Sequence, residues 1–207
     1  MLGYLKLQRH YGKWRAEVDP VQIVYLHRKD EWPWYIKNWP LLACPGNWDL
    51  ADTEYPPFRL EQMEELFRDR IPYQETKTYQ KMISQLACHG TTHAPKLNSR
   101  EEIDAYFGGV ATLYQSMKEN GFRARDPHQL SREKEITVRI GRTGALIKAG
   151  EGTHRLALAR LLKIERVSVV VDLVHTHWVQ RCLRQFDDSE PETAVHLGLE
   201  LLAPGLE

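Results

Sequence analysis

A short segment of the chain brings two glycines together with a hydroxyl, an imidazole and a guanidinium group. The segment joins an apolar strand-like run to a stretch with the character of a buried helix, and it reads Gly150-Glu151-Gly152-Thr153-His154-Arg155. The first amides of a helix have no partners inside the helix, and they point outward at the positive end of its dipole. Glycine lets an anion approach the backbone closely because it has no Cβ atom. The segment, called the glycine turn below, therefore predicts a phosphate-binding site.

The side chains of the glycine turn suit the same chemistry. Thr153 could cap the following helix or donate its hydroxyl group, and Arg155 could make a two-pronged contact with phosphate oxygens. His154 adds a donor that is partly charged near neutral pH, and it is also a candidate catalytic residue. The predicted phosphate-binding residues are Gly150, Gly152, Thr153, His154 and Arg155. The alternative is that the glycines only turn the chain and that Arg155 pairs with a surface acid.

Transfer of a phosphoryl group needs a carboxylate that binds Mg²⁺ or positions a hydroxyl nucleophile. Glu151, inside the glycine turn, is the first candidate, and the alternative is a solvated acid that balances Arg155. Asp49, beside Trp48 in an aromatic turn, is the second candidate, although it could equally form an Asx-turn. Glu75 is the third candidate.

Two further groups contain ligand-type side chains. Cys88, His89 and His93 lie close together in sequence, but nothing nearby supplies the fourth ligand of a zinc site, so no metal site is predicted there. His175 and His177 are two residues apart at the end of an apolar strand, so we expect them to face the same side of it. They could lie at the rim of the phosphate site or be ordinary surface histidines.

The elements around the glycine turn are predicted from hydrophobic periodicity. Ile136–Ile140 alternates between apolar and polar residues and predicts a half-buried strand. Gly141–Gly144 has turn composition, and Ala145–Ala149 is the return strand of a hairpin. Leu156–Leu162 is apolar on almost every side and predicts a buried helix. Val167–Val171 predicts a buried strand. This order of elements indicates an α+β or α/β core.

The remainder of the chain is mostly helical in pattern. Two helices are predicted between Phe58 and Gly90, a third begins after Ser99 in a capping box, and a fourth ends at Asn120. Nearer the N-terminus, Val21–Leu26 predicts a strand, and the Trp-rich segment 32–48 predicts a loop. The rings of that loop either pack on the core or line a ligand pocket. The last thirty residues are expected to be helical.

The composition is that of an ordinary folded protein without a strong overall charge. The 207 residues include 28 Lys plus Arg and 28 Asp plus Glu, so the formal net charge is zero and gives no support to a DNA-coating role. No apolar run approaches the roughly 20 residues that a membrane span needs. The three cysteines are widely spaced and odd in number, which does not describe a disulfide framework. We therefore expect a cytoplasmic protein without a membrane segment.

The glycine turn and its flanks resemble the core of the ParB N-terminal domain and sulfiredoxin superfamily. The match consists of Gly-x-Gly-Thr-His-Arg-Leu-Ala-Leu-Ala, preceded by Ile-Thr-Val-Arg-Ile and followed by Val-Ser-Val-Val-Val. Upstream, Val18-Asp19-Pro20 resembles the opening strand of that superfamily, and Leu113-x-x-Ser116-Met117 with Gly121 resembles the helix before its central hairpin. The resemblance implies an α+β fold with a small mixed β-sheet of ParB/sulfiredoxin type. It implies one domain over residues 1–207, with a helical insertion at about 57–119 and a phosphate-binding core at about 135–178.

The resemblance also implies that the turn holds the phosphates of ATP, ADP or CTP with Mg²⁺. Sulfiredoxins carry a cysteine directly before the His-Arg pair, whereas Thr153 stands there in this chain, so sulfiredoxin chemistry is not expected. ParB proteins that bind CTP have an arginine-rich turn and an added DNA-binding domain, but this turn has one arginine and the chain after Trp178 is short. Free serine kinases of the superfamily have the most similar turn. They imply phosphoryl transfer from a nucleotide to a small hydroxyl-bearing substrate.

Two other functions remain open at this level. The first is a nucleotide-dependent switch that signals to a partner without kinase activity. The second is a ParB-like DNA-associated protein or nuclease, which would need a basic groove and is disfavoured by the neutral charge.

Overall fold

A computed structural model describes residues 7–10, 12–26, 33–50, 53–124, 135–186 and 190–203. The chain divides into two compact units. The first, called the sheet unit, consists of Met1–Pro56, Phe122–Leu156 and Ile164–Glu207. The second, called the helical unit, consists of Pro57–Gly121 and Ala157–Lys163. Each unit has its own packed interior.

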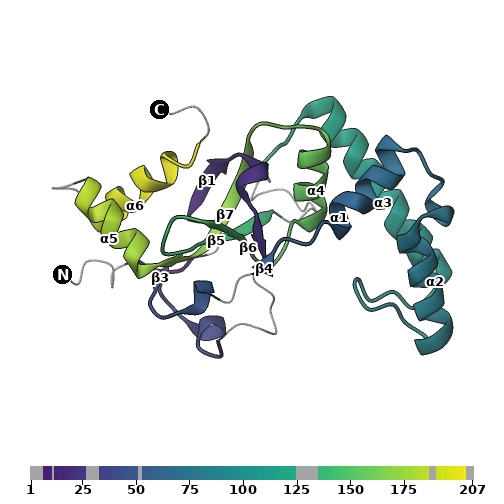
Figure 1. The fold of residues 1–207 in the computed structure, drawn as a ribbon, viewed down its shortest axis with the longest axis horizontal. Coiled ribbons are helices and arrows are strands. Elements are labelled where there is room, and N and C mark those ends of the chain that lie inside the picture. The colour runs from purple at the N-terminus through teal and green to yellow at the C-terminus, as the bar shows by residue number, and fades with distance from the viewer. Residues whose placement is uncertain are drawn as a thin grey trace. The chain divides into compact units, whose positions relative to one another are not determined.

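The sheet unit contains one mixed sheet of seven strands (Figure 1). The strand order is β1-β7-β5-β6-β2-β4, and β3 pairs with β7 outside this path. β7 is parallel to β5 and antiparallel to β1, whereas β6 is antiparallel to β5 and parallel to β2. The strands are β1 Arg15–Val18, β2 Tyr25–Leu26, β3 Ala43–Cys44, β4 Thr53–Glu54, β5 Ile136–Ile140, β6 Leu146–Lys148 and β7 Val167–His175. The architecture is thus mixed α/β with a mixed sheet.

The predicted hairpin and the strand after it are confirmed. The turn between β5 and β6 is closed by a hydrogen bond from the amide of Gly144 to the carbonyl of Gly141 at 3.0 Å, and Gly144 has a φ of +94° that suits glycine. β7 extends the predicted strand to His175. Every residue of β5 is buried, including Thr137 and Arg139, so the expectation of a half-buried strand is wrong. β5 therefore lies in the interior between β7 and β6.

The prediction of a strand over Val21–Leu26 is wrong for its first half. Pro20–Gln22 forms a 3₁₀ helix, and only Tyr25–Leu26 belongs to the sheet. The side chain of Asp19 accepts a hydrogen bond from the amide of Val21 at 2.8 Å. Proline has a fixed φ near that of a helix and lacks an N–H group for a strand ladder, so the Asp19-Pro20 pair begins a turn instead.

The helical unit contains α1 Phe58–Met63, which continues as one turn of π-helix over Glu64–Arg68, then α2 Lys77–His89 and α3 Arg100–Asn120. The prediction of separate third and fourth helices is wrong, because α3 is continuous over 21 residues. Its interior glycines, Gly108 and Gly109, face open space and cost some helix stability without breaking the helix. The predicted cap is confirmed, since Ser99 Oγ accepts from the amide of Glu102 at 3.2 Å.

The interior of the helical unit is a cluster of aromatic and aliphatic side chains. The rings of Tyr73, Tyr79 and Phe107 lie 5.3 to 5.6 Å apart. The buried members of the cluster are Tyr79, Met82, Ile103 and Phe107.

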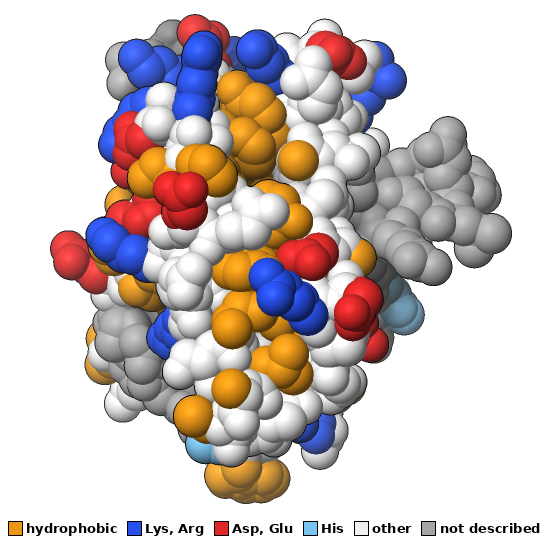
Figure 2. All heavy atoms as spheres, turned by 90° about the vertical axis from the view of Figure 1, so that its right-hand side faces the viewer, with side chains coloured by type: hydrophobic (Ala, Val, Ile, Leu, Met, Phe, Trp, Pro, Cys, Tyr) orange, Lys and Arg blue, Asp and Glu red, His pale blue; other side chains and the backbone are white. Residues whose placement is uncertain are grey.

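Figure 2 shows one face of the molecule, on which hydrophobic side chains and charged side chains of both signs are interspersed.

The helices α4 Thr153–Leu161, α5 Thr176–Gln185 and α6 Pro191–Glu200 complete the six α-helices of the described residues. The expected helical C-terminal region is confirmed over α5 and α6, which pack on each other. Within the described part of the chain, no helix combines the length and the apolar character needed to cross a membrane.

Candidate functional site

The glycine turn connects β6 to α4, at the strand-to-helix junction that the sequence predicts. Gly150 and Gly152 have φ values of +56° and +81°, in the left-handed region that favours glycine. A Cβ atom at Gly152 would lie 2.5 Å from the carbonyl oxygen of Glu135 and 2.5 Å from the Cα atom of Ile136. Glycine is therefore required at position 152 because the turn packs against the chain's own backbone.

The side chain of Lys148, the last residue of β6, is buried against the glycine turn. Its ammonium group donates to the carbonyl oxygens of Ala149 at 2.8 Å and Gly150 at 3.2 Å, and also to that of Glu151. An ammonium group has three donors, so this one side chain serves three acceptors. Burial lowers the pKa of Lys148 from its ordinary 10.5 to about 7, although the nearby Glu151 carboxylate acts in the opposite direction. Lys148 thereby fixes three successive peptide groups.

The amides of these peptide groups point away from Lys148. In a trans peptide the C=O and N–H bonds point in opposite directions, so three inward carbonyls turn the amides of residues 150–152 outward. Among the described residues, the amides of Gly150, Gly152 and Thr153 donate to no other group. Successive amides that point the same way from left-handed turn residues form a concave anion-binding nest, and the start of a helix adds its dipole.

Helix α4 begins one residue earlier than a Thr153 cap would require. The carbonyl of Gly152 accepts the first helical hydrogen bond, from the amide of Leu156 at 3.0 Å, so Gly152 occupies the cap position. Thr153 is therefore the first helical residue, and the expectation that it caps the helix is wrong. The side chains of Thr153 and His154 are both half-buried at the helix start.

Arg155 is engaged with the chain that follows α3. Its side chain is buried, and the guanidinium lies 4.1 Å from the centre of the Phe122 ring. Its Nη2 atom donates to the carbonyl oxygen of Arg123. These contacts anchor the turn to the Phe122–Arg123 segment.

The three candidate carboxylates lie in three different places. Glu151 is exposed on the glycine turn. Asp49 lies beside the β5–β6 hairpin turn, at the other end of β5 from the glycine turn. The length of β5 separates the two sites by about 13 Å, at roughly 3.3 Å per residue. Glu75 belongs to the helical unit, where it precedes Thr76, the N-cap residue of α2. The structure therefore places only Glu151 on the glycine turn.

The carboxylate of Asp49 is held by Arg142. The backbone amide of Arg142 donates to Oδ2 at 2.7 Å, and its guanidinium donates to both carboxylate oxygens at 2.7 to 3.1 Å. Burial alone would raise the pKa of Asp49, but the hydrogen bonds from Arg142, together with the charges of His175 and Arg142, outweigh burial and leave the pKa below its ordinary value. Asp49 thus ties its own turn to the hairpin.

The expectation that His175 and His177 face the same side of a strand is wrong. β7 ends at His175, and α5 begins at Thr176, so the two-residue alternation stops between them. His175 Nδ1 accepts from the amide of His177 at 3.0 Å, and Nε2 lies 2.8 Å from the carbonyl oxygen of Gly46. These partners select the tautomer with a proton on Nε2, and burial lowers the pKa of His175. His175 is a helix cap that also holds the Gly46 turn.

Trp39 and Trp48 of the Trp-rich segment pack against the core, whereas the ring of Trp34 is 87% exposed. Trp39 Nε1 donates to the carbonyl of Ala43 at 2.9 Å, and Trp48 Nε1 donates to that of Cys44 at 3.1 Å. Trp48 is buried in a cluster with Ile147 and Leu173.

Lys148 is the residue of the site that the sequence-based prediction missed. A lysine inside a predicted buried strand, directly before a predicted phosphate turn, was the available signal. Among the described residues, no group of three His, Cys, Asp or Glu side chains could hold a metal ion. Comparisons with protein-family models, with curated proteins and with solved structures found no match to this chain.

Proposed function

We propose that the protein binds a nucleotide by its phosphates at the glycine turn and transfers a phosphoryl group to a small hydroxyl-bearing substrate. The observation that supports this most is the position of Lys148, whose three hydrogen bonds turn the carbonyls of residues 149–151 inward. The outward amides of Gly150 and Gly152, together with the amide of Thr153 in the first turn of α4, then make a preformed anion site. The nucleotide is ATP, ADP or CTP.

The catalytic carboxylate in this proposal is Glu151. Mg²⁺ in nucleotide sites is held by one or two carboxylates together with phosphate oxygens, so a single acid on the turn suffices to hold it. The oxygen of the substrate hydroxyl forms a bond to the terminal phosphorus, and the bond from that phosphorus to its bridging oxygen breaks. The hydroxyl proton passes to a carboxylate or to solvent, and the shortened nucleotide leaves. The imidazole of His154 is the first side-chain donor after Thr153, the last residue of the phosphate nest.

A nucleotide-dependent switch is the second candidate. It is favoured by Arg155, which follows the nest by two residues and contacts Phe122 and Arg123. A phosphate bound at the turn would shift Arg155 and, through its contacts, the segment after α3. In that case the bound nucleotide would alter a partner's affinity or the oligomeric state and would not be consumed.

Labelled nucleotide distinguishes the two candidates. The protein is incubated with ATP or CTP, Mg²⁺ and a mixture of small hydroxyl-bearing metabolites, and a new labelled product supports the kinase. Glu151→Gln should reduce its formation by about 10²-fold or more with nucleotide affinity largely retained, because an electrostatic interaction made mainly in the transition state changes turnover more than binding. Glu165→Gln, at an exposed acid of the same unit, is the matched control. If no product forms while nucleotide changes the elution volume of the protein, the switch replaces the kinase.

A further inference from the structure

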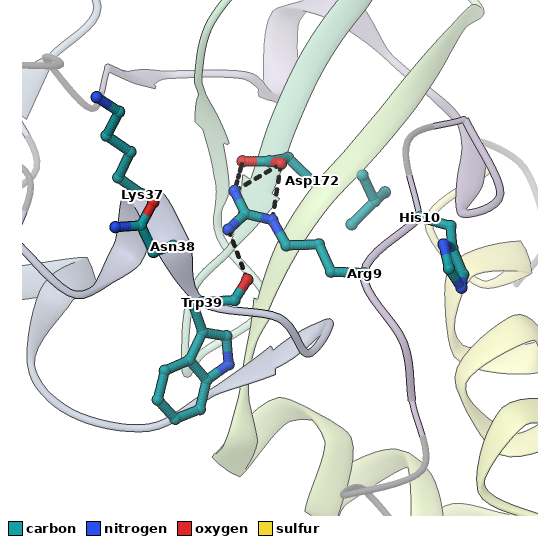
Figure 3. A pocket seen from close by; sticks show the side chains of 7 residues that line it. Arg9, His10, Lys37, Asn38, Trp39 and Asp172 are labelled. Carbon is teal, nitrogen blue, oxygen red and sulfur yellow. Dashed lines mark hydrogen bonds and ion pairs between the residues drawn. The ribbon is translucent and has the colours of Figure 1, made fainter.

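A cavity of about 270 Å³ opens on the sheet unit, and none of the residues that line it belongs to the glycine turn. Three segments surround it: the N-terminal segment before β1, the Trp-rich segment and β7 (Figure 3). Figure 3 shows the Arg9 guanidinium between Asp172 and the backbone of Trp39, with His10 on one side and Lys37 and Asn38 on the other. The lining residues are Arg9, His10, Lys37, Asn38, Trp39, Val171 and Asp172.

The floor of the cavity is shaped by a β-bulge. Val171 and Leu173 of β7 pair with consecutive residues of β5, so Asp172 between them is the extra residue. A bulge re-aims the side chain of the extra residue, and bulges are frequent beside functional sites. Here it sets the Asp172 carboxylate between two arginines. Arg9 donates to both of its oxygens at 2.8 Å, and the fully buried Arg139 donates to Oδ2 at 3.1 Å.

The position of Arg9 is fixed independently of any ligand. Its Nη1 atom donates to the carbonyl oxygens of Ile36 at 2.8 Å and Trp39 at 3.1 Å. The guanidinium thus joins the Trp-rich segment to β7 and forms a rigid wall. A binding site built on such a wall needs little reorganisation when a ligand enters.

The mouth of the cavity carries polar side chains that the protein itself does not use. Among the described residues, the side chains of His10, Lys37 and Asn38 have no hydrogen-bond or ion-pair partner. Lys37 adds a cation to that of Arg9 in the lining, and the fully buried Arg139 behind the lining offsets the carboxylate of Asp172. Asn38 offers an amide, and Trp39 offers part of an aromatic ring.

We propose that this cavity binds a small organic anion, a carboxylate or a phosphate monoester. Its cationic wall and rim favour negative charge, and the amide of Asn38 supplies a polar contact for the rest of the ligand. The volume lies just below the roughly 300–1,000 Å³ of pockets for drug-sized ligands, so a small metabolite fits and a whole nucleotide does not. The proposal does not depend on the function of the glycine turn.

The test uses the full chain labelled with ¹⁵N-asparagine. Malonate and, in a separate series, inorganic phosphate are titrated, and the amide signals of Asn38 are followed by NMR after assignment with Asn38→Gln. Asn98 and Asn120, both in the helical unit, are internal references. Lys37→Gln should weaken the binding of malonate, phosphate or both by about threefold to fivefold, the change expected for an exposed ion pair. Lys81→Gln, at an exposed lysine on α2, should leave the affinity unchanged.

The two anions identify the ligand class. A saturable shift of the Asn38 amide signals with malonate supports a carboxylate ligand. A saturable shift with phosphate supports a phosphate monoester. The proposal is overturned if Asn38 is unmoved by both anions at roughly 10 mM, ten times a Kd of about 1 mM. Equal affinity in the wild type and in Lys37→Gln also overturns it.

Discussion

Replacement of Lys148 by methionine removes the ammonium group that orients the glycine turn while it retains a side chain of similar length. We expect the wild type to bind sulfate at the turn, with an affinity that falls as the pH rises through about 7. Sulfate is a suitable probe because its charge is constant over this range, unlike that of phosphate. Only the charged form of Lys148 has three donors for the three carbonyls, so loss of its proton removes one of the three hydrogen bonds from Lys148.

The size of the effect follows from the pKa of Lys148. With a pKa of about 7, roughly nine-tenths of the side chains are charged at pH 6 and one-tenth at pH 8. If only the charged form organises the nest, the apparent affinity is reduced in proportion to that fraction. The affinity of the wild type should therefore fall about tenfold between pH 6 and pH 8. Lys148→Met should bind sulfate weakly at both pH values, without this decrease.

Isothermal titration calorimetry at fixed ionic strength measures both affinities. The ordinary pKa of a histidine lies close to this range, so His154→Gln is the essential control and should retain the decrease. Lys81→Met should behave as the wild type, and thermal unfolding of each variant verifies that it is folded. A wild-type affinity that is flat from pH 6 to 8, or a decrease that persists in Lys148→Met, would refute the role of Lys148.

Three further predictions concern neighbouring residues. Asp49→Asn should lower the free energy of unfolding by about 2–3 kcal/mol in denaturant titrations, because it breaks a largely buried ion pair, and should leave product formation unchanged. Since the folded pKa of Asp49 is lowered, its stabilisation is present above its ordinary value of 3.8 and is lost as the pH falls further. Gly152→Ala should destabilise the protein by about 2–4 kcal/mol through overpacking at a positive φ, whereas Gly108→Ala should stabilise it by about 0.5–1 kcal/mol. Arg155→Met should lower the unfolding free energy by about 1–3 kcal/mol and change sulfate affinity by less than about threefold, since its guanidinium contacts Phe122 and Arg123. A much larger loss of sulfate affinity would assign Arg155 directly to the anion.

Local pattern in the sequence was sufficient for the hairpin, for the strand-to-helix junction and for most helices. The two-residue alternation of β5 and the Gly-rich turn after it depend on neighbours a few positions away, and such short-range rules hold without tertiary information. They fail where two local preferences compete. The Asp19-Pro20 pair overrode a β-branched run, and Gly108 and Gly109 did not interrupt α3.

Contacts between segments that are distant in sequence determine which residues belong to the candidate site. Sequence proximity to aromatic residues suggested Asp49 as a partner of the glycine turn, but the hairpin places the two at opposite ends of β5. Arg155 has the residue type of a phosphate ligand, and its guanidinium contacts Phe122 and Arg123, which are distant in sequence. Lys148 can donate to the carbonyls of the glycine turn only because the turn folds back over its side chain. A buried ammonium group is stable only where hydrogen-bond acceptors surround it. The acceptors of Lys148 are backbone carbonyls, and their positions depend on the path of the chain and not on residue types.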